Sequence, residues 1–300
     1  MRLVLLFCAG VCALFLSACR SSGDHARPST ESPPESAEAD PGISLYEQRL
    51  LDAIEDLRAL DAAAAQYDEE DRDNIERRFR QVANAFNSII ASNPDGLEAR
   101  LIYGKLLDRY GDRSGALEQF AEVIDRDPTI AVAHQQVGTY FAEEGEFAKA
   151  LAYYLNAVAA APEESAYHYS LGDLLYTFRP GFIEEGIFTA ERLDETMLEA
   201  FRAAAALAPD DLRLQFRYGE AFADLADPAW ETALAHWETL SRHDDLTPLQ
   251  RDAALLHRAR SLGELERYRE ARELLAEIED NGLAPSKEAL LAALDEAEAR

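Results

Sequence analysis

The chain has 300 residues, of which 57 are acidic and 29 are lysine or arginine, so its formal net charge at pH 7 is −28. A surface of this charge is repelled by phosphate backbones and by anionic lipid headgroups. The composition therefore argues against a nucleic-acid-binding protein and against attachment to a membrane through a basic patch.

The first nineteen residues have the pattern of an export signal. Arg2 supplies a positive charge, residues 3–16 are almost wholly apolar, and the sequence Leu16-Ser17-Ala18-Cys19 follows. The apolar stretch is too short to cross about 30 Å of hydrocarbon and ends in small residues, which predicts a cleaved signal peptide rather than a membrane span.

The segment that ends at Cys19 resembles the lipobox of bacterial lipoproteins. The resemblance implies that residues 1–18 are removed and that Cys19 carries acyl chains, such as palmitate, which hold the protein on a bilayer. Arg20, in a place where an aspartate favours the inner membrane, then points to the outer membrane with the folded domain in the periplasm. The alternative is an ordinary secretory peptide cleaved near Ala18. Cys8 and Cys12 are the only other cysteines, so a lipidated mature chain has no free thiol.

Residues 19–43 separate this signal from the rest of the chain. The segment is rich in Ser, Pro, Glu, Ala and Asp and has almost no apolar side chains. Such a composition cannot bury enough surface to offset the entropy of ordering it, so we expect a flexible tether.

Proline and glycine recur at a fixed step in the next part of the chain. Pro94, Pro128 and Pro162 are 34 residues apart, and so are Gly104, Gly138 and Gly172, each glycine ten residues after its proline. Pro209 and Gly219 repeat the same offset. A period of this length predicts an array of stacked helical units.

The units resemble the tetratricopeptide repeat, a helical hairpin with a small residue midway along its first helix and an alanine and an aromatic residue in its second. Ala116 and Phe120, and likewise Ala150 and Tyr154, occupy the latter two places. The resemblance implies an all-α solenoid of about five to six repeats over residues 44–285, capped by a last helix within residues 286–300. The alternative, another kind of helical-hairpin array, concerns the two ends. Helices are expected at 44–66, 72–92, 96–110, 113–126, 130–144, 146–160, 165–176, from 193, 255–263, 266–279 and 287–299.

The third glycine unit departs from the pattern, because about thirteen extra residues precede its second helix. We place this insert at residues 177–192. Loops that interrupt a regular array often have a function. Its apolar residues could dock a partner, fold back and cover the binding groove of the repeats, or simply pack on themselves; they are Phe178, Phe182, Ile183 and Phe188.

In tetratricopeptide repeats the first helix of each hairpin lines a binding groove, with the positions three before and one after each glycine pointing into it. The matching residues, with Tyr176 one turn farther on, are Leu101, Lys105, Gln135, Thr139, Tyr169, Asp173, Tyr176, Phe216 and Glu220. The Lys and Asn pattern with which some family members clamp a terminal carboxylate is missing. We expect either a groove for an extended segment of an envelope protein, with the aromatic residues as anchors, or partial burial of these residues by neighbouring turns.

No motif for catalysis, for a cofactor or for a metal ion is present, and no catalytic residue can be singled out. His134 and His168 occupy equivalent places 34 residues apart, for which packing is the simpler explanation. The sequence therefore favours a non-enzymatic interaction scaffold in the cell envelope. Two alternatives stay open: a small-ligand-binding or enzymatic protein with its site in the groove or the insert, and a self-assembling structural protein.

Overall fold

A computed structural model describes residues 44–66 and 71–299, which contain α-helices, a short 3₁₀ turn and no strand. The predicted signal peptide, the lipidated Cys19 and the tether lie outside these residues. Within the described part, no helix combines the length and the apolar composition that are needed to cross a membrane.

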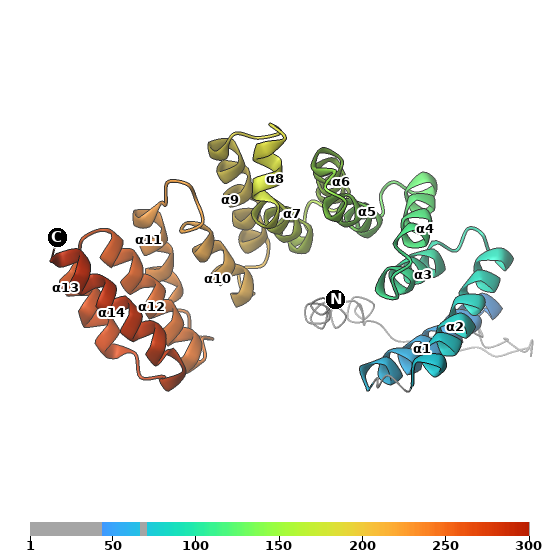
Figure 1. Ribbon diagram of the computed structural model, residues 1–300, viewed down its shortest axis with the longest axis horizontal. Helices are drawn as coiled ribbons and strands as arrows, with labels where there is room; N and C mark the ends of the chain where they lie inside the picture. The colour runs from blue at the N-terminus through green and yellow to red at the C-terminus, as the bar shows by residue number, and fades with distance from the viewer. Residues whose placement is uncertain (1–43, 67–70, 300) are drawn as a thin grey trace, which may run out of the picture. The chain divides into compact units, whose positions relative to one another are not determined.

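The first six helices form three antiparallel hairpins that follow one another along the chain (Figure 1). Their bounds are α1 Leu45–Ala65, α2 Arg72–Ser92, α3 Leu97–Arg109, α4 Arg113–Arg126, α5 Ala131–Glu143 and α6 Phe147–Ala160. Each second helix also packs on the first helix of the next hairpin. The predicted helices here agree with the observed ones to within a few residues, so the expected all-α solenoid of tetratricopeptide-type hairpins is confirmed.

The later helices continue the stack with larger departures from the repeat. They are α7 Ser165–Thr177, α8 Arg179–Glu184, α9 Ala190–Leu207, α10 Leu212–Ala221, α11 Trp230–Leu240, α12 Pro248–Glu264, α13 Tyr268–Glu277, the 3₁₀ turn Asn281–Leu283 and α14 Ala284–Glu298. Helix α9 pairs with α7, and the short helix α8 lies between them in sequence.

Three helices begin earlier than the sequence predicted, two of them at a capping residue. Helix α9 begins at Ala190 rather than near Leu193, since the Thr189 side chain accepts a hydrogen bond from the N–H of Arg192. Helix α12 begins at Pro248 instead of residue 255, since Thr247 and Gln250 form a reciprocal capping box. Helix α14 begins at Ala284 instead of residue 287, with a proline in its first turn.

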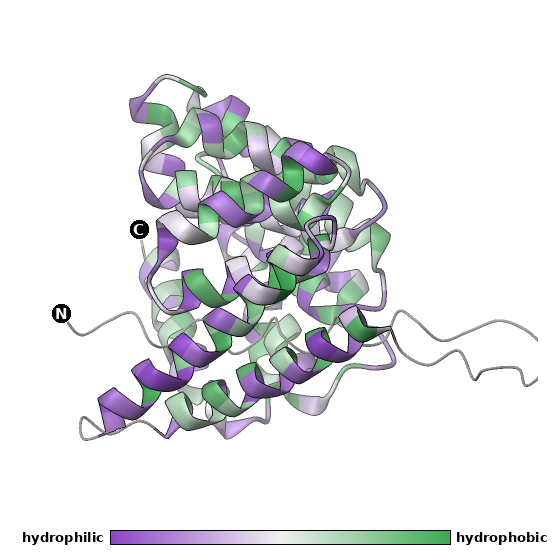
Figure 2. Ribbon diagram, turned by 90° about the vertical axis from the view of Figure 1, so that its right-hand side faces the viewer, coloured by the Kyte–Doolittle hydropathy of each residue, from purple (hydrophilic) through white to green (hydrophobic). Residues whose placement is uncertain are grey.

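Each hairpin from α3 to α11 is centred on a glycine that an aromatic ring covers. A methyl group added at Gly104 would lie 2.7 Å from Phe120, and one at Gly138 would lie 2.6 Å from Tyr154. Gly172 meets Phe201 and Gly219 meets Trp237 in the same way, at 2.8 and 2.5 Å. The helices therefore cross at a distance that only glycine permits. Hydrophobic and hydrophilic residues are interleaved along the helices (Figure 2). The buried side chains are almost all apolar and make up the core between the helices.

The tight turns after α3, α5 and α12 share one backbone conformation. Gly111 has φ 91° and Gly145 has φ 78°, and Glu266 has φ 59° at the equivalent place after α12. A positive φ costs glycine little but is unfavourable for a residue with a Cβ atom. The last hairpin thus uses the turn of the regular hairpins with a less suitable residue.

The insert packs mainly on its own aromatic residues and on α6. Phe182 is fully buried, and its ring centre lies 5.4 Å from that of Phe147 and 5.9 Å from that of Phe188. Phe178 also contacts Phe147, at 5.7 Å. Of the four apolar residues singled out from the sequence, only Ile183 is exposed. The aromatic side chains of the insert thus pack on one another and on α6, and Phe182 has no surface open to a partner.

Candidate functional site: a pocket beside the widened fifth hairpin

The connection between α10 and α11 is longer than in the regular hairpins. Helices α3 and α5 end five residues beyond their crossing glycines, whereas α10 ends at Ala221, two residues beyond Gly219. Residues 222–229, which we call the wide turn, then lead to α11. This longer connection separates the end of α10 from the start of α11.

A pocket of about 380 Å³ opens at this place. Its walls come from the end of α7, from α10, from the wide turn, and from α11 and α12. The side chains that define its chemistry are Tyr176, Arg217, Glu220, Asp224, Trp230, Trp237, His257 and Arg260.

Two tryptophans, the only ones in the chain, form the apolar part of the pocket. Trp237 is 2% exposed, and the imidazole of His257 stacks on its ring at 4.4 Å with an interplanar angle of 9°. Trp230 is partly exposed, and the guanidinium of Arg260 lies 5.5 Å from its ring centre. Flat aromatic faces next to charged groups are suited to holding an amphipathic side chain.

Arg217 fixes the opposite wall. Its guanidinium lies 4.5 Å from the ring centre of Tyr176 and 4.1 Å from that of Phe201, and its Nη1 donates to Asp224 Oδ2 over 2.9 Å. The Arg217 side chain is only 14% exposed. The ring of Tyr176 is held in this way yet remains 45% exposed, which is the state expected of a binding anchor that is already ordered.

The ionisable groups of the pocket are shifted by their partial removal from water. Burial raises the pKa of Glu220, opposed by the attraction of Arg217 and supported by the repulsion of Asp224. Burial, with the repulsion of Arg260, lowers the pKa of His257 to about 4. Because His257 is neutral at pH 7, its Nε2, 3.9 Å from Glu220 Oε1, does not compensate the charge of that carboxylate.

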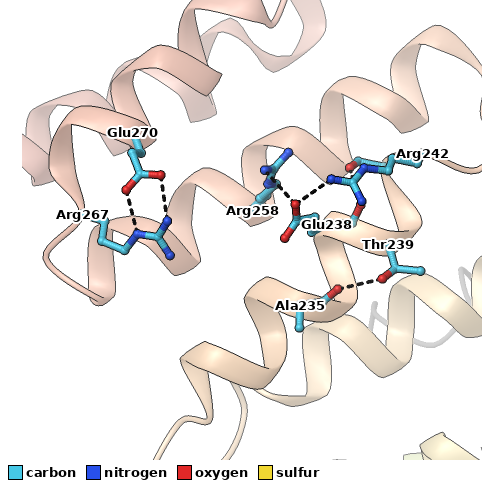
Figure 3. A network of polar contacts seen from close by, with 8 residues as sticks. Ala235, Glu238, Thr239, Arg242, Arg258, Arg267 and Glu270 are labelled. Carbon is cyan, nitrogen blue, oxygen red and sulfur yellow. Dashed lines mark hydrogen bonds and ion pairs between the residues drawn. The ribbon is translucent and has the colours of Figure 1, made fainter.

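One ion pair joins α11 to α12. Glu238 of α11 pairs with Arg242, just beyond the end of α11, at 2.7 Å and with Arg258 of α12 at 3.6 Å (Figure 3). The second pair helps to hold α12, and therefore His257 and Arg260, against α11. The pocket is thus completed by a helix of the following repeat.

Of the nine groove residues expected from the repeat, Tyr176 and Glu220 line this pocket. Tyr169 packs on Phe201 and Phe216 packs edge-on against Trp237, at 5.9 and 5.4 Å between ring centres. Both aromatic rings are therefore partly buried in the core rather than presented in full as anchors.

The other five predicted groove residues lie on α3, α5 and α7. Gln135 Nε2 donates to Ser170 Oγ over 2.6 Å, which joins two hairpins, and the hydroxyl of Thr139 lies 2.9 Å from that of Tyr154. Leu101 packs against the buried apolar core that the helices α1 to α5 share, whereas Lys105 and Asp173 are exposed. Partial burial by neighbouring turns thus describes much of the predicted groove on these helices.

Arg217, Trp237, His257 and Arg260 were not predicted as site residues from the sequence. One signal was available: Ala233 and Trp237 come two residues later than the repeat requires, which indicates a longer connection. The proximity of α12 to α7 could not be read from the sequence.

His134 and His168 have a structural role. The Nε2 atom of each lies 2.9 or 2.8 Å from the carbonyl oxygen of the proline six residues earlier, Pro128 or Pro162. Because a carbonyl only accepts, each imidazole N–H donates and fixes the turn that enters the helix. Among residues 44–66 and 71–299, no group of three or more His, Cys, Asp or Glu side chains could hold a metal ion.

Comparison with known proteins agrees with this architecture. Residues 138–179 match the tetratricopeptide repeat. No similar sequence was found among curated proteins. The fold is similar to that of YrrB, described as a TPR protein with an unusual peptide-binding site, with 19% identity, a TM-score of 0.51, and coverage of 69% of this chain and 99% of YrrB. It is also similar to the C-terminal part of a TPR repeat-containing protein from Cytophaga hutchinsonii, with 17% identity, a TM-score of 0.50, and coverage of 84% and 93%. The chain therefore has the fold of a tetratricopeptide-repeat solenoid, with the family's sequence pattern in residues 138–179, from the middle of α5 to just beyond the end of α7.

Proposed function

We propose that this protein is a non-enzymatic scaffold, held on the periplasmic side of the outer membrane through Cys19, that binds an extended segment of another envelope protein. A solenoid of helical hairpins is an interaction module, because stacked repeats present a long continuous surface. The peptide-binding site ascribed to YrrB is consistent with such a use of the fold.

The observation that supports the proposal most is the pocket beside the wide turn. Tyr176 is exposed while its ring is already fixed by Arg217, and Trp230 stands at the rim beside Arg260. Aromatic and arginine side chains of this kind contribute most of the free energy in protein interfaces. We propose that a side chain of the partner enters here while its backbone lies along α7 and α10.

The test is cross-linking of the lipidated protein in cells, followed by purification and mass spectrometry of what is recovered. The wild type is compared with a Tyr176→Ala/Glu220→Gln variant and with Asp108→Ala as a matched control. Asp108 is exposed four residues after Gly104, the place in α3 that Tyr176 has in α7. One envelope protein, recovered with the wild type and the control but lost with the double variant, is expected. Equal recovery with all three would refute a role for the pocket.

Attachment to the membrane through Cys19 is tested separately. Cys19→Ala removes the proposed lipidation site, so the variant should leave the membrane fraction and appear in the soluble periplasmic extract. If it still sediments with membranes, lipid attachment at Cys19 is wrong, whatever the pocket binds.

A small molecule is the second candidate for the pocket. A volume of about 380 Å³ falls within the range of roughly 300–1,000 Å³ that is usual for small-ligand sites. Native mass spectrometry of the purified protein distinguishes the two, because a retained ligand adds a fixed mass that Trp230→Ala should abolish.

A further inference from the structure

The insert contacts the wide turn of the following hairpin. Arg179, the first residue of α8, donates from Nη1 to the carbonyl oxygen of Asp224 over 3.3 Å. The same Nη1 pairs with Asp194 Oδ1 of α9 at 2.5 Å. The other oxygen of Asp194 accepts the N–H of Ala226 over 2.7 Å. Three segments, α8, α9 and the wide turn, are thereby joined through two side chains.

These two side chains are shielded from solvent. The Arg179 side chain is 22% exposed and that of Asp194 is 11% exposed. A pair in this position is screened little by salt, and its hydrogen bonds to the backbone are charge-assisted. Removing one partner would leave the other charge buried without compensation, which is unfavourable. The arrangement therefore holds the turn in one position.

The wide turn has few other attachments at its centre. Its backbone bonds lie near its ends, from Ala223 N to Glu220 O, from Asp224 N to Ala221 O and from Ala229 N to Phe222 O. Between them, the N–H of Ala226 is bound by Asp194, the carbonyl of Asp224 is bound by Arg179, and the side chain of Leu225 packs on the core. Without the two polar contacts, the middle of the turn would be held mainly by the packing of Leu225.

The position of the turn determines the pocket. Ala223 and Asp224 form part of its wall, and the carboxylate of Asp224 binds Arg217, whose guanidinium holds Tyr176. A series of contacts therefore leads from Asp194 through Arg179 and the backbone of Asp224 to the exposed ring of Tyr176.

We infer that Arg179 is a positioning residue: together with Asp194 it forms a brace through which the insert holds the wide turn, and so sets how tightly the pocket binds its partner. The insert then positions the turn of the following hairpin rather than presenting a docking surface of its own. The claim that the brace affects binding rests on the proposed function, whereas the claim that it holds the wide turn does not.

Full-length protein purified in detergent can test both steps. Because Trp230 and Trp237 are the only tryptophans, two fluorotryptophan resonances report on the pocket alone, and a Trp230→Phe variant assigns them. Arg179→Met should shift or broaden the Trp230 resonance. It should also increase amide hydrogen exchange at Ala226 at least about tenfold, because opening the turn no longer breaks the Arg179 bond to the Asp224 carbonyl, and Asp194, which accepts the Ala226 N–H, loses the arginine that holds it. Exchange in α3–α6 should not change.

Three further variants keep the result interpretable. Arg192→Met removes an exposed arginine of α9 whose partner Glu195 is also exposed, and it should match the wild type. Arg179→Lys keeps a positive charge beside Asp194, but its flexible ammonium lacks the fixed planar geometry that places Nη1 against both Asp194 and the Asp224 carbonyl, so an intermediate change is expected. Asp194→Asn, which is less disruptive to folding, should also increase exchange at Ala226.

Partner recovery from cells completes the test. Recovery should fall severalfold with Arg179→Met and stay at the wild-type level with Arg192→Met. Unchanged tryptophan resonances and exchange in Arg179→Met would overturn the brace itself. Changed resonances with full recovery would overturn its role in binding and leave the proposed function standing. If the wild type recovers no partner, the proposed function fails, and the brace is judged by resonances and exchange alone.

Discussion

The regular hairpins, α3–α4 and α5–α6, and the fifth hairpin, α10–α11, are built on the same contact but present different surfaces. In all three an aromatic ring of the second helix covers a glycine of the first. The regular hairpins close with a glycine turn, whereas the fifth closes with the wide turn 222–229 and has a pocket beside it. The glycine–aromatic contact therefore determines how the two helices of a hairpin pack. The turn that connects them can differ in length between hairpins, and a longer turn can form a binding site.

The insert offers the strongest way to test whether an irregular segment belongs to the core. Phe182 is fully buried, so Phe182→Ala should lower the free energy of unfolding by about 3–5 kcal/mol in chemical denaturation. Ile183→Ala, one residue away and exposed, should change it by less than about 0.5 kcal/mol. Equal effects of the two changes would show that the insert is not packed as described.

Substitution of the crossing glycines tests whether the regular hairpins and α10–α11 share the same close helix packing. A methyl group at Gly138 would meet the ring of Tyr154 at 2.6 Å, so Gly138→Ala should cost about 1–3 kcal/mol through overpacking. Gly219→Ala should cost a similar amount and, because it displaces Trp237, should also shift the tryptophan emission. A neutral Gly138→Ala, measured by denaturation, would mean that the helices are not held at this distance.

The pocket should make stability depend on pH through His257, whose pKa burial lowers to about 4. Between its unfolded pKa and about 4, the unfolded chain binds a proton that the folded chain does not. The free energy of unfolding should therefore fall on acidification, by roughly 2 kcal/mol from pH 7 to pH 5. His257→Gln should lose this component, while the raised pKa values of Glu220 and Asp173, which act in the opposite direction, remain in both proteins. Parallel stability–pH profiles would contradict the burial of His257.

The smallest expected effect concerns the tight turns. Glu266→Gly should raise stability by up to about 1 kcal/mol, because glycine adopts the positive φ of this turn without strain, partly offset by the greater freedom of the unfolded chain. Gly145→Ala should lower it by about 1 kcal/mol for the converse reason. Thermal unfolding of both variants gives the signs directly, and a loss of stability in Glu266→Gly would show that the two turns are not equivalent.

The order of helices from α2 to α7 could be predicted because it follows from a strict period. Proline and glycine at a step of 34 mark where helices end and where they cross, and both effects are local and steric. The covering aromatics Phe120 and Tyr154 were placed correctly for the same reason. Helix α8 was not predicted, because Arg179-Pro180-Gly181 has the composition of a turn although a proline is also tolerated in a first helical turn.

The pocket could be predicted only in part. Tyr176 and Glu220 followed from their offsets to the crossing glycines. Arg217, His257 and Arg260 could not be predicted as pocket residues in this way. Their place in the pocket depends on how α12 packs beside α11, which no spacing within one repeat determines. The brace joins residues 45 and 32 positions apart, and such pairs carry no local signal.

The most direct test of the pocket as the binding site is a photo-crosslinking phenylalanine analogue placed in living cells at position 176, and separately at position 108, the equivalent place in the regular hairpin α3–α4. We predict a covalent adduct with one envelope protein from position 176 and none from position 108, because only the former lies at the rim of the pocket. An adduct from position 108 alone would place the interaction on the regular hairpins. Equal adducts from both would show an extended groove without an anchor in the pocket, and would contradict a distinct role of the wide turn in binding.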